Sequence, residues 1–472
     1  MMSTVNVISP QVTKDEVVEK DLLEKREINP DTILPKVELF VNQRQELYLL
    51  LNTKGNTWCV TTKLGVLFTA LCDGYTCIRD IYDRIKPYLP RFKIADAVKL
   101  AIQLDEAGIF QVLDRPSIDS LSNIEANITK KCNLSCPFCY ADSGPNVDIP
   151  EEKMLRLVDW VNIAKKAISI NPNTRFIISG GEPLLHPDAM EIISNLCNMG
   201  IKKVVLVTNG TLLTNERIRT LTKLPNLRVQ LSIDSLIPEE NAKTRGKHHL
   251  AKALKALNLM KDGGIDVVTS ATVTQINQAS IWRLCHYCSE IGVKFRTSVF
   301  FIVGKRSKKY QASLGLSPKG MWEIAELNAD YLTPVELANS FDVHVRPGLR
   351  QYTCGIGYGT VAIDYDGTVY PCNHLTTPEF ALGNTRRDSL IDIVKRGKSK
   401  YSFIDVDYPQ NNECNVCPVR YQCTGGCRGN SYHHFGTLEV PPPECEWLRQ
   451  AAIESLWINV MGTDYCSLRR KN

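Results

Sequence analysis

The sequence lacks any uninterrupted apolar run of about 18 residues, the shortest length that commonly spans a membrane. Residues 1–30 are polar and charged, and they lack the apolar core of a signal peptide. An excess of one charge is also missing, because 56 basic and 51 acidic residues leave a net charge of only +5. So small a surplus gives no reason to expect nucleic acid or an anionic membrane as a partner. We therefore expect a globular cytoplasmic protein.

The length of 472 residues exceeds that of one ordinary domain and predicts two to four, at roughly 100 to 200 residues each. We divide the chain by composition and by hydrophobic periodicity. The expected parts are a flexible polar leader (1–35), a small N-terminal domain (36–115), a central α/β domain (120–305), a bridge (306–350), a cysteine-rich domain (351–447) and a C-terminal helix or tail (448–472).

Cysteine, by contrast, is abundant, and 17 cysteines in a large cytosolic chain indicate metal rather than disulfides. Cys132, Cys136 and Cys139 form a C-x3-C-x2-C loop within eight residues. Three thiolates can hold three irons of a [4Fe-4S] cube and leave the fourth iron open to an exogenous chelating ligand. A zinc ion would usually need four ligands in two spaced pairs, and a disulfide would need an oxidising compartment. The cluster is therefore the favoured interpretation.

Residues 124–300 alternate short β-branched runs with amphipathic stretches, which predicts parallel strands joined by helical crossovers. The expected strands lie at residues 124–129, 175–179, 204–208, 227–233, 267–273 and 293–300. Six such units indicate a partial (β/α)6 TIM-like barrel, in which a site forms at the carboxyl ends of the strands. The cysteine loop follows the first of these strands.

Small or polar residues follow the next three expected strands. A Gly-Gly-Glu-Pro run comes after the second, where paired glycines allow backbone to approach a ligand without an intervening side chain. For each polar residue, an ordinary turn or helix cap is the alternative interpretation. The candidate cofactor-binding residues are Gly180, Gly181, Glu182, Asn209, Ser232, Asp234 and Arg245.

The triplet, with the aromatic Phe138 before its third cysteine, and the Gly-Gly-Glu-Pro run resemble motifs of the radical S-adenosylmethionine (radical SAM) superfamily. The resemblance implies that SAM chelates the open iron and that a reduced cluster cleaves it to a 5'-deoxyadenosyl radical. It also implies that the candidate residues contact SAM, with Arg245 pairing its carboxylate, a task that suits a guanidinium. An electron donor such as flavodoxin or ferredoxin is a further expectation.

A second cysteine pattern resembles the SPASM domain of the same superfamily. It comprises Cys354, Cys372, Cys414, Cys417, Cys423, Cys427 and Cys445. The resemblance implies two auxiliary iron–sulfur clusters, expected to be [4Fe-4S]. One would use Cys354, Cys372 and Cys427, and the other would use the remaining four. The first set is one ligand short, so its cluster has an open iron or another ligand, for which His374 is a candidate. A zinc ribbon at residues 414–427 is the alternative, but it leaves the outer three cysteines unexplained.

The N-terminal domain is expected to be winged-helix-like. Its expected strands lie at residues 37–41, 47–51 and 109–113, and its helices at 64–72, 78–88 and 94–107. It resembles the PqqD-like domain, or RiPP recognition element, which implies that it binds the leader of a precursor peptide as an added strand. A DNA-binding winged helix and a structural cap are the alternatives. The acidic Asp80 and Asp83 on the second helix favour peptide binding.

These resemblances predict a SAM-cleaving oxidoreductase that installs an oxidative modification, such as a thioether or other cross-link, in a ribosomally made precursor peptide. One alternative is maturation of a protein subunit or of a quinone-type cofactor precursor. Another, of a different class, is a non-catalytic peptide carrier or redox sensor. The catalytic acid or base is not identified by the sequence.

Two further motifs carry weaker expectations. In sulfatase-maturing relatives, an aspartate proposed as base follows the cysteine of G-x4-C, where this chain has Asn373. An amide cannot accept that proton, so the sequence disfavours sulfatase maturation. Cys285 and Cys288 have the spacing of a redox pair, but they lie in a helical pattern beside apolar residues, and we expect them to pack within the core.

Overall fold

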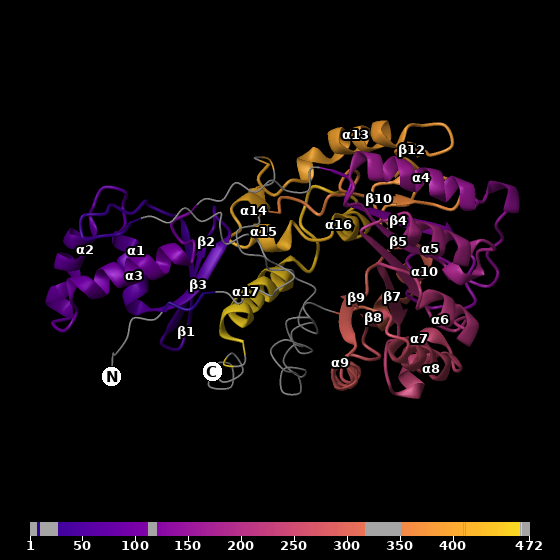
Figure 1. Ribbon diagram of the computed structural model, residues 1–472, viewed down its shortest axis with the longest axis horizontal. Helices are drawn as coiled ribbons and strands as arrows, with labels where there is room; N and C mark the ends of the chain where they lie inside the picture. Colours follow the sequence, from indigo (N-terminus) through magenta and orange to yellow (C-terminus); the bar gives the residue numbers. More distant parts are fainter. Residues whose placement is uncertain are drawn as a thin grey trace.

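The computed structural model describes residues 7–9, 27–111, 120–316, 351–408, 410, 412–462 and 464. Most of the expected leader, most of the bridge and the end of the expected C-terminal tail lie outside the described residues. Figure 1 shows an elongated molecule with the N-terminal domain at one end and the barrel at the other. The C-terminal residues lie between these two parts and extend over one side of the barrel (Figure 1). Among the described residues, none of the helices combines the length and apolarity needed to cross a membrane.

The N-terminal domain is an antiparallel three-stranded sheet followed by three helices. Its elements are β1 (Leu39–Arg44), β2 (Leu47–Asn52), β3 (Thr57–Thr62), α1 (Lys63–Leu71), α2 (Ile78–Ile85) with the 3-10 turn η3 (Lys86–Tyr88), and α3 (Ile94–Glu106). The three helices follow the prediction, but β3 was not predicted. Residues 109–111 do not form the expected strand. The side chain of Asn52 donates to the carbonyls of Ile109 and Gln111, and holds this segment as a turn.

Both faces of this small sheet are buried, because its apolar residues alternate between two cores. Leu50 and Cys59 belong to the core formed with the three helices. Trp58 and Val60 belong to the large core that also contains Trp457, on the last helix, α17 (Cys445–Met461). The N-terminal domain is therefore packed against the C-terminal helix.

The barrel consists of six parallel strands in sequential order, as predicted. They are β4 (Asn123–Thr129), β5 (Arg175–Gly180), β6 (Lys203–Thr208), β7 (Leu227–Ser232), β8 (Asp266–Val273) and β9 (Lys294–Val299). The helices of this part are α4 (Leu157–Ile170), α5 (Ala189–Asn198), α6 (Asn215–Leu221), α7 (Pro238–Arg245), α8 (His249–Asp262), α9 (Ile281–Glu290) and α10 (Gly304–Leu314). Two 3-10 turns, η4 (Glu151–Lys153) and η5 (Pro183–Leu185), lie in its loops.

The cysteine-rich domain continues the barrel sheet, which the sequence did not predict. Its hairpin pairs in parallel with β4, so the sheet has nine strands in the order β12-β11-β10-β4-β5-β6-β7-β8-β9. Lys130 and Asp364 add an ion pair of 2.8 Å across this boundary. The further elements are β10 (Thr360–Ile363), β11 (Thr368–Tyr370), η6 (Pro378–Phe380), β12 (Gly383–Asn384), α13 (Leu390–Tyr401), η7 (Ser402–Ile404), α14 (Asn412–Asn415), α15 (Arg420–Cys423) and α16 (Arg428–Phe435).

Candidate metal and cofactor site

The cysteine triplet lies in the loop that follows β4, at the carboxyl end of the barrel strands. Burial raises the pKa of the Cys132 thiol to about 12, and the neighbouring Cys136 and Cys139 add to that rise. The backbone N–H groups of Leu134 and Ser143 point at the sulfurs of Cys132 and Cys139, at 3.5 and 3.4 Å. Three grouped sulfurs that accept backbone N–H groups suit a cluster, because hydrogen bonds to the sulfurs stabilise bound thiolates.

The start of α10 holds this loop in place. The carboxylate of Asp142 accepts hydrogen bonds from the backbone N–H groups of Lys305 and Arg306, each at 2.9 Å. In return, the guanidinium of Arg306 donates to the carbonyls of Ser143 at 2.7 Å and Cys136 at 3.4 Å. The sequence did not indicate Arg306, because it lies in the expected bridge and far along the chain from its partners.

The paired glycines after β5 are required by backbone packing. A Cβ atom on Gly180 would lie 2.2 Å from the carbonyl oxygen of Thr129, and one on Gly181 would lie 2.2 Å from that of Lys131. The N–H of Gly181 donates to the Thr129 carbonyl at 2.7 Å. The glycines thus allow the end of β5 to lie directly against the start of the cysteine loop.

Glu182 is fully buried, and its carboxylate bonds to protein groups. It accepts hydrogen bonds from the Thr208 hydroxyl at 2.7 Å, from the Asn209 N–H at 2.9 Å and from the Leu184 N–H at 3.2 Å. Burial raises the pKa of Glu182, and these three donors oppose the rise. In this arrangement the carboxylate fixes the loop after β6, including Asn209.

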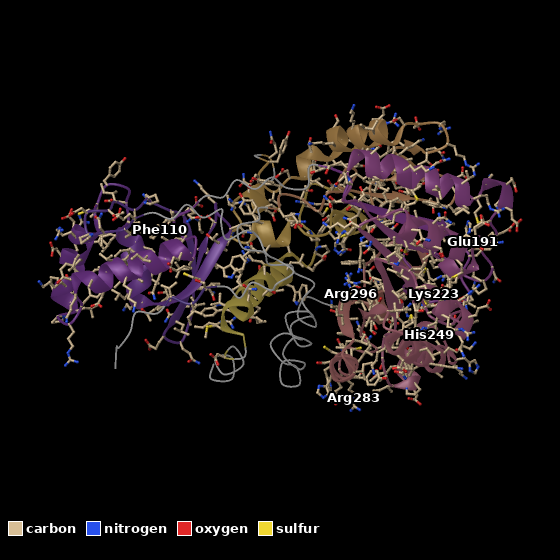
Figure 2. All side chains as sticks on the ribbon, viewed as in Figure 1. Phe110, Glu191, Lys223, His249, Arg283 and Arg296 are labelled. Atoms are coloured by element: carbon tan, nitrogen blue, oxygen red, sulfur yellow. The ribbon has the colours of Figure 1, made fainter. Side chains whose placement is uncertain are left out.

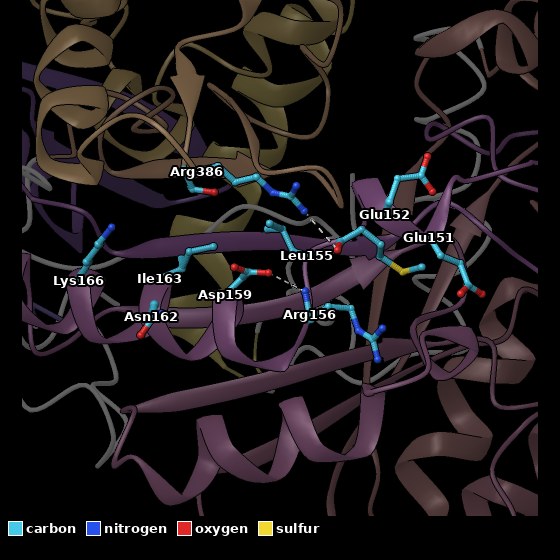
Figure 3. Close-up of a pocket in the computed structure, with 11 residues that line it drawn as sticks. Glu151, Glu152, Leu155, Arg156, Asp159, Asn162, Ile163, Lys166 and Arg386 are labelled. Atoms are coloured by element: carbon cyan, nitrogen blue, oxygen red, sulfur yellow. Dashed lines mark hydrogen bonds between the residues drawn. The ribbon is translucent and has the colours of Figure 1, made fainter.

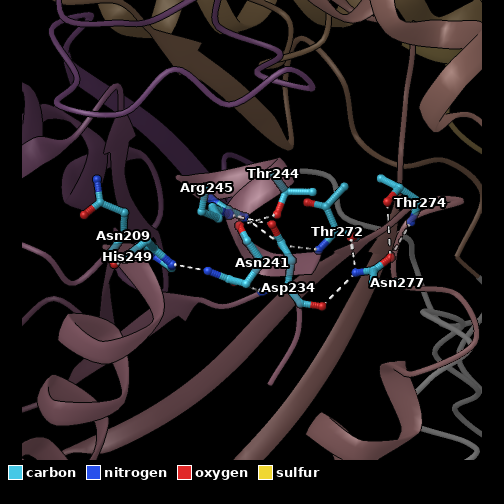
Figure 4. A network of polar contacts seen from close by, with 9 residues as sticks. All are labelled: Asn209, Asp234, Asn241, Thr244, Arg245, His249, Thr272, Thr274 and Asn277. Atoms are coloured by element: carbon cyan, nitrogen blue, oxygen red, sulfur yellow. Dashed lines mark hydrogen bonds and ion pairs between the residues drawn. The ribbon is translucent and has the colours of Figure 1, made fainter. Parts of the chain in front are cut away.

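Asp234 and Arg245 form a largely buried ion pair (Figure 4). The guanidinium donates to both carboxylate oxygens, at 2.7 and 3.0 Å. It also stacks over the Phe138 ring at 5.0 Å, and its charge acts against the burial that raises the pKa of Cys136 to about 11. Arg245 therefore contacts the cysteine loop, and it does so while paired with Asp234, another of the predicted cofactor residues.

His249 links this pair to the Asn209 loop. Its Nε2 donates to the Asn209 carbonyl, and its Nδ1 accepts from the Asn241 side chain, both at 3.0 Å (Figure 4). Burial, assisted by the charge of Arg245, lowers the pKa of His249 to about 4. The ring is consequently neutral, and its two hydrogen bonds connect the Asn209 loop to α7. Ser232 ends β7 at the same end of the barrel.

The first expected auxiliary set is brought together at the junction with the barrel. Burial raises the pKa of the Cys372 thiol, and Glu125, Cys427 and Cys354 raise it further. His374 is half-buried, and its Nδ1 lies 3.1 Å from the sulfur of Cys427. His374 thus lies next to Cys427, in the cysteine set for which the sequence assigned only three of the four cluster ligands.

The second expected set is grouped separately. Burial raises the pKa of Cys423 to about 12, and the neighbouring Cys417, Cys445 and Cys414 contribute to the rise. Among the described residues, no three His, Cys, Asp or Glu side chains are arranged as ligands of a single ion. The thiolates of a cube bind separate irons and lie further apart than the ligands of one ion.

Cys285 and Cys288 lie on α9 and are buried, so the structure confirms that they pack in the core.

A hollow of about 670 Å³ lies outside the barrel, between η4, α4 and the loop after β12 (Figure 3). Its lining includes Glu151, Asp159 and Arg386 but no cysteine. Figure 2 places Phe110 and His249 at opposite ends of the molecule, so the N-terminal domain lies far from the barrel site.

Residues 126–288 match the family model of the radical SAM superfamily, and residues 354–418 match that of SPASM, an iron–sulfur cluster-binding domain. The chain has the radical SAM fold with a C-terminal SPASM domain. Together these domains imply SAM and [4Fe-4S] clusters, auxiliary clusters included. All the candidate SAM residues lie within the first match, whereas Cys423, Cys427 and Cys445 lie beyond the second.

Proteins similar to this chain include the antilisterial bacteriocin subtilosin biosynthesis protein AlbA of Bacillus subtilis, 27% identical over 342 residues, which are 70% of this chain and 71% of AlbA. The sporulation killing factor maturation protein SkfB of the same organism is 27% identical over 61% of this chain and 70% of SkfB. The crystal structure of SuiB from Streptococcus suis, bound to S-adenosylmethionine, aligns with a TM-score of 0.55 and 17% identity. That alignment covers 88% of this chain and 99% of SuiB.

Proposed function

We propose that this protein is a radical SAM enzyme that modifies a ribosomally made precursor peptide. The observation that carries the proposal is the presence of three separate cysteine groups, one at the barrel mouth and two in the SPASM domain. By their names, AlbA acts in the biosynthesis of a bacteriocin and SkfB in the maturation of a killing factor. SuiB has also been crystallised with its precursor peptide SuiA.

Different residues of the barrel and of the SPASM domain would bind the individual clusters and SAM. Cys132, Cys136 and Cys139 would ligate the SAM-binding cluster, and the Asp234–Arg245 pair beside Phe138 would meet the carboxylate of SAM. Bound there, SAM supplies a 5'-deoxyadenosyl radical that removes a hydrogen atom from the substrate. Cys354, Cys372 and Cys427 would hold one auxiliary cluster, with His374 as a candidate fourth ligand. The four remaining SPASM cysteines would hold the other.

We further propose that the modification is oxidative and joins a cysteine sulfur to carbon. Such a thioether would form when the C–H gives a hydrogen atom to the 5'-deoxyadenosyl radical and the S–H loses a proton, while one electron passes from the peptide to an auxiliary cluster. The side chain of Asn373 is an amide and cannot take the proton of the S–H group. Its backbone N–H donates to the carboxylate of Glu125 at 2.9 Å. The electron that first reduces the SAM cluster would come from a flavodoxin or ferredoxin.

The N-terminal domain is proposed to bind the leader of the precursor peptide by strand addition. Its sheet is small, antiparallel and covered on both faces, which leaves the edges for pairing. The likeness to SuiB, which covers 88% of the chain, extends further than the radical SAM and SPASM matches together.

The test is incubation of the reconstituted protein with SAM, a reductant and the small peptide encoded beside its gene. We expect 5'-deoxyadenosine and a peptide lighter by two hydrogens. The matched control replaces Cys132, Cys136 and Cys139 by Ala, which leaves the SPASM cysteines intact and should abolish both products. Absence of 5'-deoxyadenosine together with an unchanged peptide would refute the proposal. Modification of a neighbouring protein subunit in place of the peptide would support the alternative substrate.

A further inference from the structure

Only the edges of the N-terminal sheet are open to a further strand. One face packs on α1, α2 and α3 through residues such as Leu50, and the other packs towards α17 through Trp58. At the β1 edge, Asn42 accepts a hydrogen bond from the Trp457 indole at 2.8 Å, and Arg44 forms an ion pair with Glu454. Side chains of β1 thus contact α17, whereas the edge of β3 has a partner that pairs with its backbone.

The edge of β3 carries a short segment of this same chain. The N–H of Ile8 donates to the carbonyl of Val60 at 2.9 Å, and the N–H of Val60 donates to the carbonyl of Ile8 at 3.0 Å. The two residues form an antiparallel bridge. Val7 packs against the core under the three helices, whereas Ile8 is 38% exposed. Backbone pairing at an edge, with alternate side chains directed into the adjacent core, is the mode by which sheets bind extended peptides.

The contact made by the described residues 7–9 is small. Within the described residues 7–9 it consists of these two hydrogen bonds. Pro10 follows in the sequence and has no N–H with which to extend a ladder. Each backbone hydrogen bond contributes little net free energy in water. A peptide that pairs with more of Thr57–Thr62 would form more bonds than the segment that it replaces.

We propose that residues 7–9 occupy the peptide-binding edge of β3 and are displaced from it by the precursor peptide. The inference rests on the proposed function, since it takes the N-terminal sheet as the recognition unit. It names the edge, the antiparallel direction and an apolar side chain at the position of Val7 as features of the bound peptide. Because the segment is tethered, it competes as an intramolecular ligand and weakens the apparent affinity for a free peptide.

A pair of proline variants of the full chain isolates the bridge. Ile8→Pro removes the N–H that donates to Val60. Ser9→Pro is the matched control, because the N–H groups of neighbouring residues in a strand point to opposite sides, so both hydrogen bonds of Ile8 remain. Hydrogen exchange at the Val60 amide reports whether the edge is open, and exchange at Leu50, in the central strand, reports whether the fold is intact. We expect Val60 to exchange faster only in Ile8→Pro, with Leu50 unchanged.

The binding probe is a fluorescein-labelled synthetic peptide with the sequence of residues 3–12, followed by anisotropy. We expect Ile8→Pro to bind it about tenfold more tightly than the wild type and Ser9→Pro do. The same peptide with proline in place of its isoleucine should not bind. Equal affinity of all three proteins, or a Val60 amide that exchanges equally in all three, would overturn the inference. Neither measurement requires 5'-deoxyadenosine, so a failure of the proposed enzyme activity would be seen separately.

Discussion

At the scale of single residues, the barrel mouth is built from side chains that bond mainly to one another. Glu182 and Asp234 were both predicted to contact SAM, and the structure shows each carboxylate accepting several protein hydrogen bonds. That both residues follow strands of the barrel could be predicted from the sequence. Most of their bonding partners could not, since Thr208, Asn209 and Thr272 lie 26 to 38 residues away along the chain. Arg306 gave no signal at all, because its role depends on where α10 begins.

Arg306→Ala is expected to loosen the cysteine loop, because it removes the donors to Ser143 and Cys136. Hydrogen bonds from a charged donor contribute about 1.5–3 kcal/mol, so we expect about tenfold weaker SAM binding and a broadened electron paramagnetic resonance signal of the reduced cluster with SAM. Lys305→Ala is the matched control, since Lys305 uses only its backbone N–H. Identical spectra and SAM affinities for both variants would contradict this role.

Gly181→Ala is expected to destabilise the fold by about 3 kcal/mol, because its Cβ would lie 2.2 Å from the carbonyl oxygen of Lys131. Gly200→Ala provides the comparison. Nothing lies within 4 Å of a Cβ there, and its positive φ of 76° alone should cost about 1–2 kcal/mol. Thermal unfolding of the two variants measures the difference. A smaller loss of stability for Gly181→Ala than for Gly200→Ala would show that the backbone can yield at this point.

At the scale of elements, polar contacts at helix ends set how the barrel layers meet. Asp188 precedes α5 and accepts a two-pronged ion pair from Arg156, at 2.7 and 2.8 Å, and a hydrogen bond from the Leu157 N–H at the start of α4. The alternating pattern predicted helical crossovers between the strands. It could not predict that one carboxylate joins their starts, because that contact depends on how the helices lie on the sheet.

Asp188→Asn is expected to lower the stability of the barrel by about 1 kcal/mol near neutral pH. The hydrogen bonds from Arg156 are the main reason why the pKa of Asp188 falls from 3.8 to about 2. The folded-state pKa lies below the ordinary value, so the contribution is fully present above about pH 4 and is lost as the pH falls towards 2. The difference in melting temperature between wild type and variant should shrink over that range. A constant difference would exclude ionisation of Asp188 as its source.

At the scale of the whole molecule, α17 joins the N-terminal domain to the SPASM domain. It starts at Cys445, a predicted cluster ligand, and it packs against β3 and contacts β1 through Trp457. A cluster bound at Cys445 would hold the start of α17, and α17 in turn packs against the N-terminal domain. The sequence predicted that Cys445 is a cluster ligand and that a C-terminal helix or tail follows it. It did not predict the surface that this helix covers.

Cys445→Ala, or removal of iron by a chelator, is expected to loosen the N-terminal domain, because the start of α17 loses its anchor. Hydrogen exchange in α17 and at the face of β3 that carries Trp58 should then accelerate several-fold. Cys77→Ala is the control, since Cys77 precedes α2 and belongs to neither expected cluster set. Equal exchange in the two variants would show that α17 is held by its apolar packing alone.

The sequence by itself determined the cysteine groups, the six parallel strands and the carboxyl-end position of the triplet, because spacing and hydrophobic periodicity are local properties of the chain. Only the tertiary structure decided that the SPASM hairpin extends the barrel sheet beside β4, that Arg306 clamps the cysteine loop and that Ile8 pairs with Val60. Each of these is a contact between distant segments. Such contacts are selected by the packing of all the elements together, which no local pattern encodes.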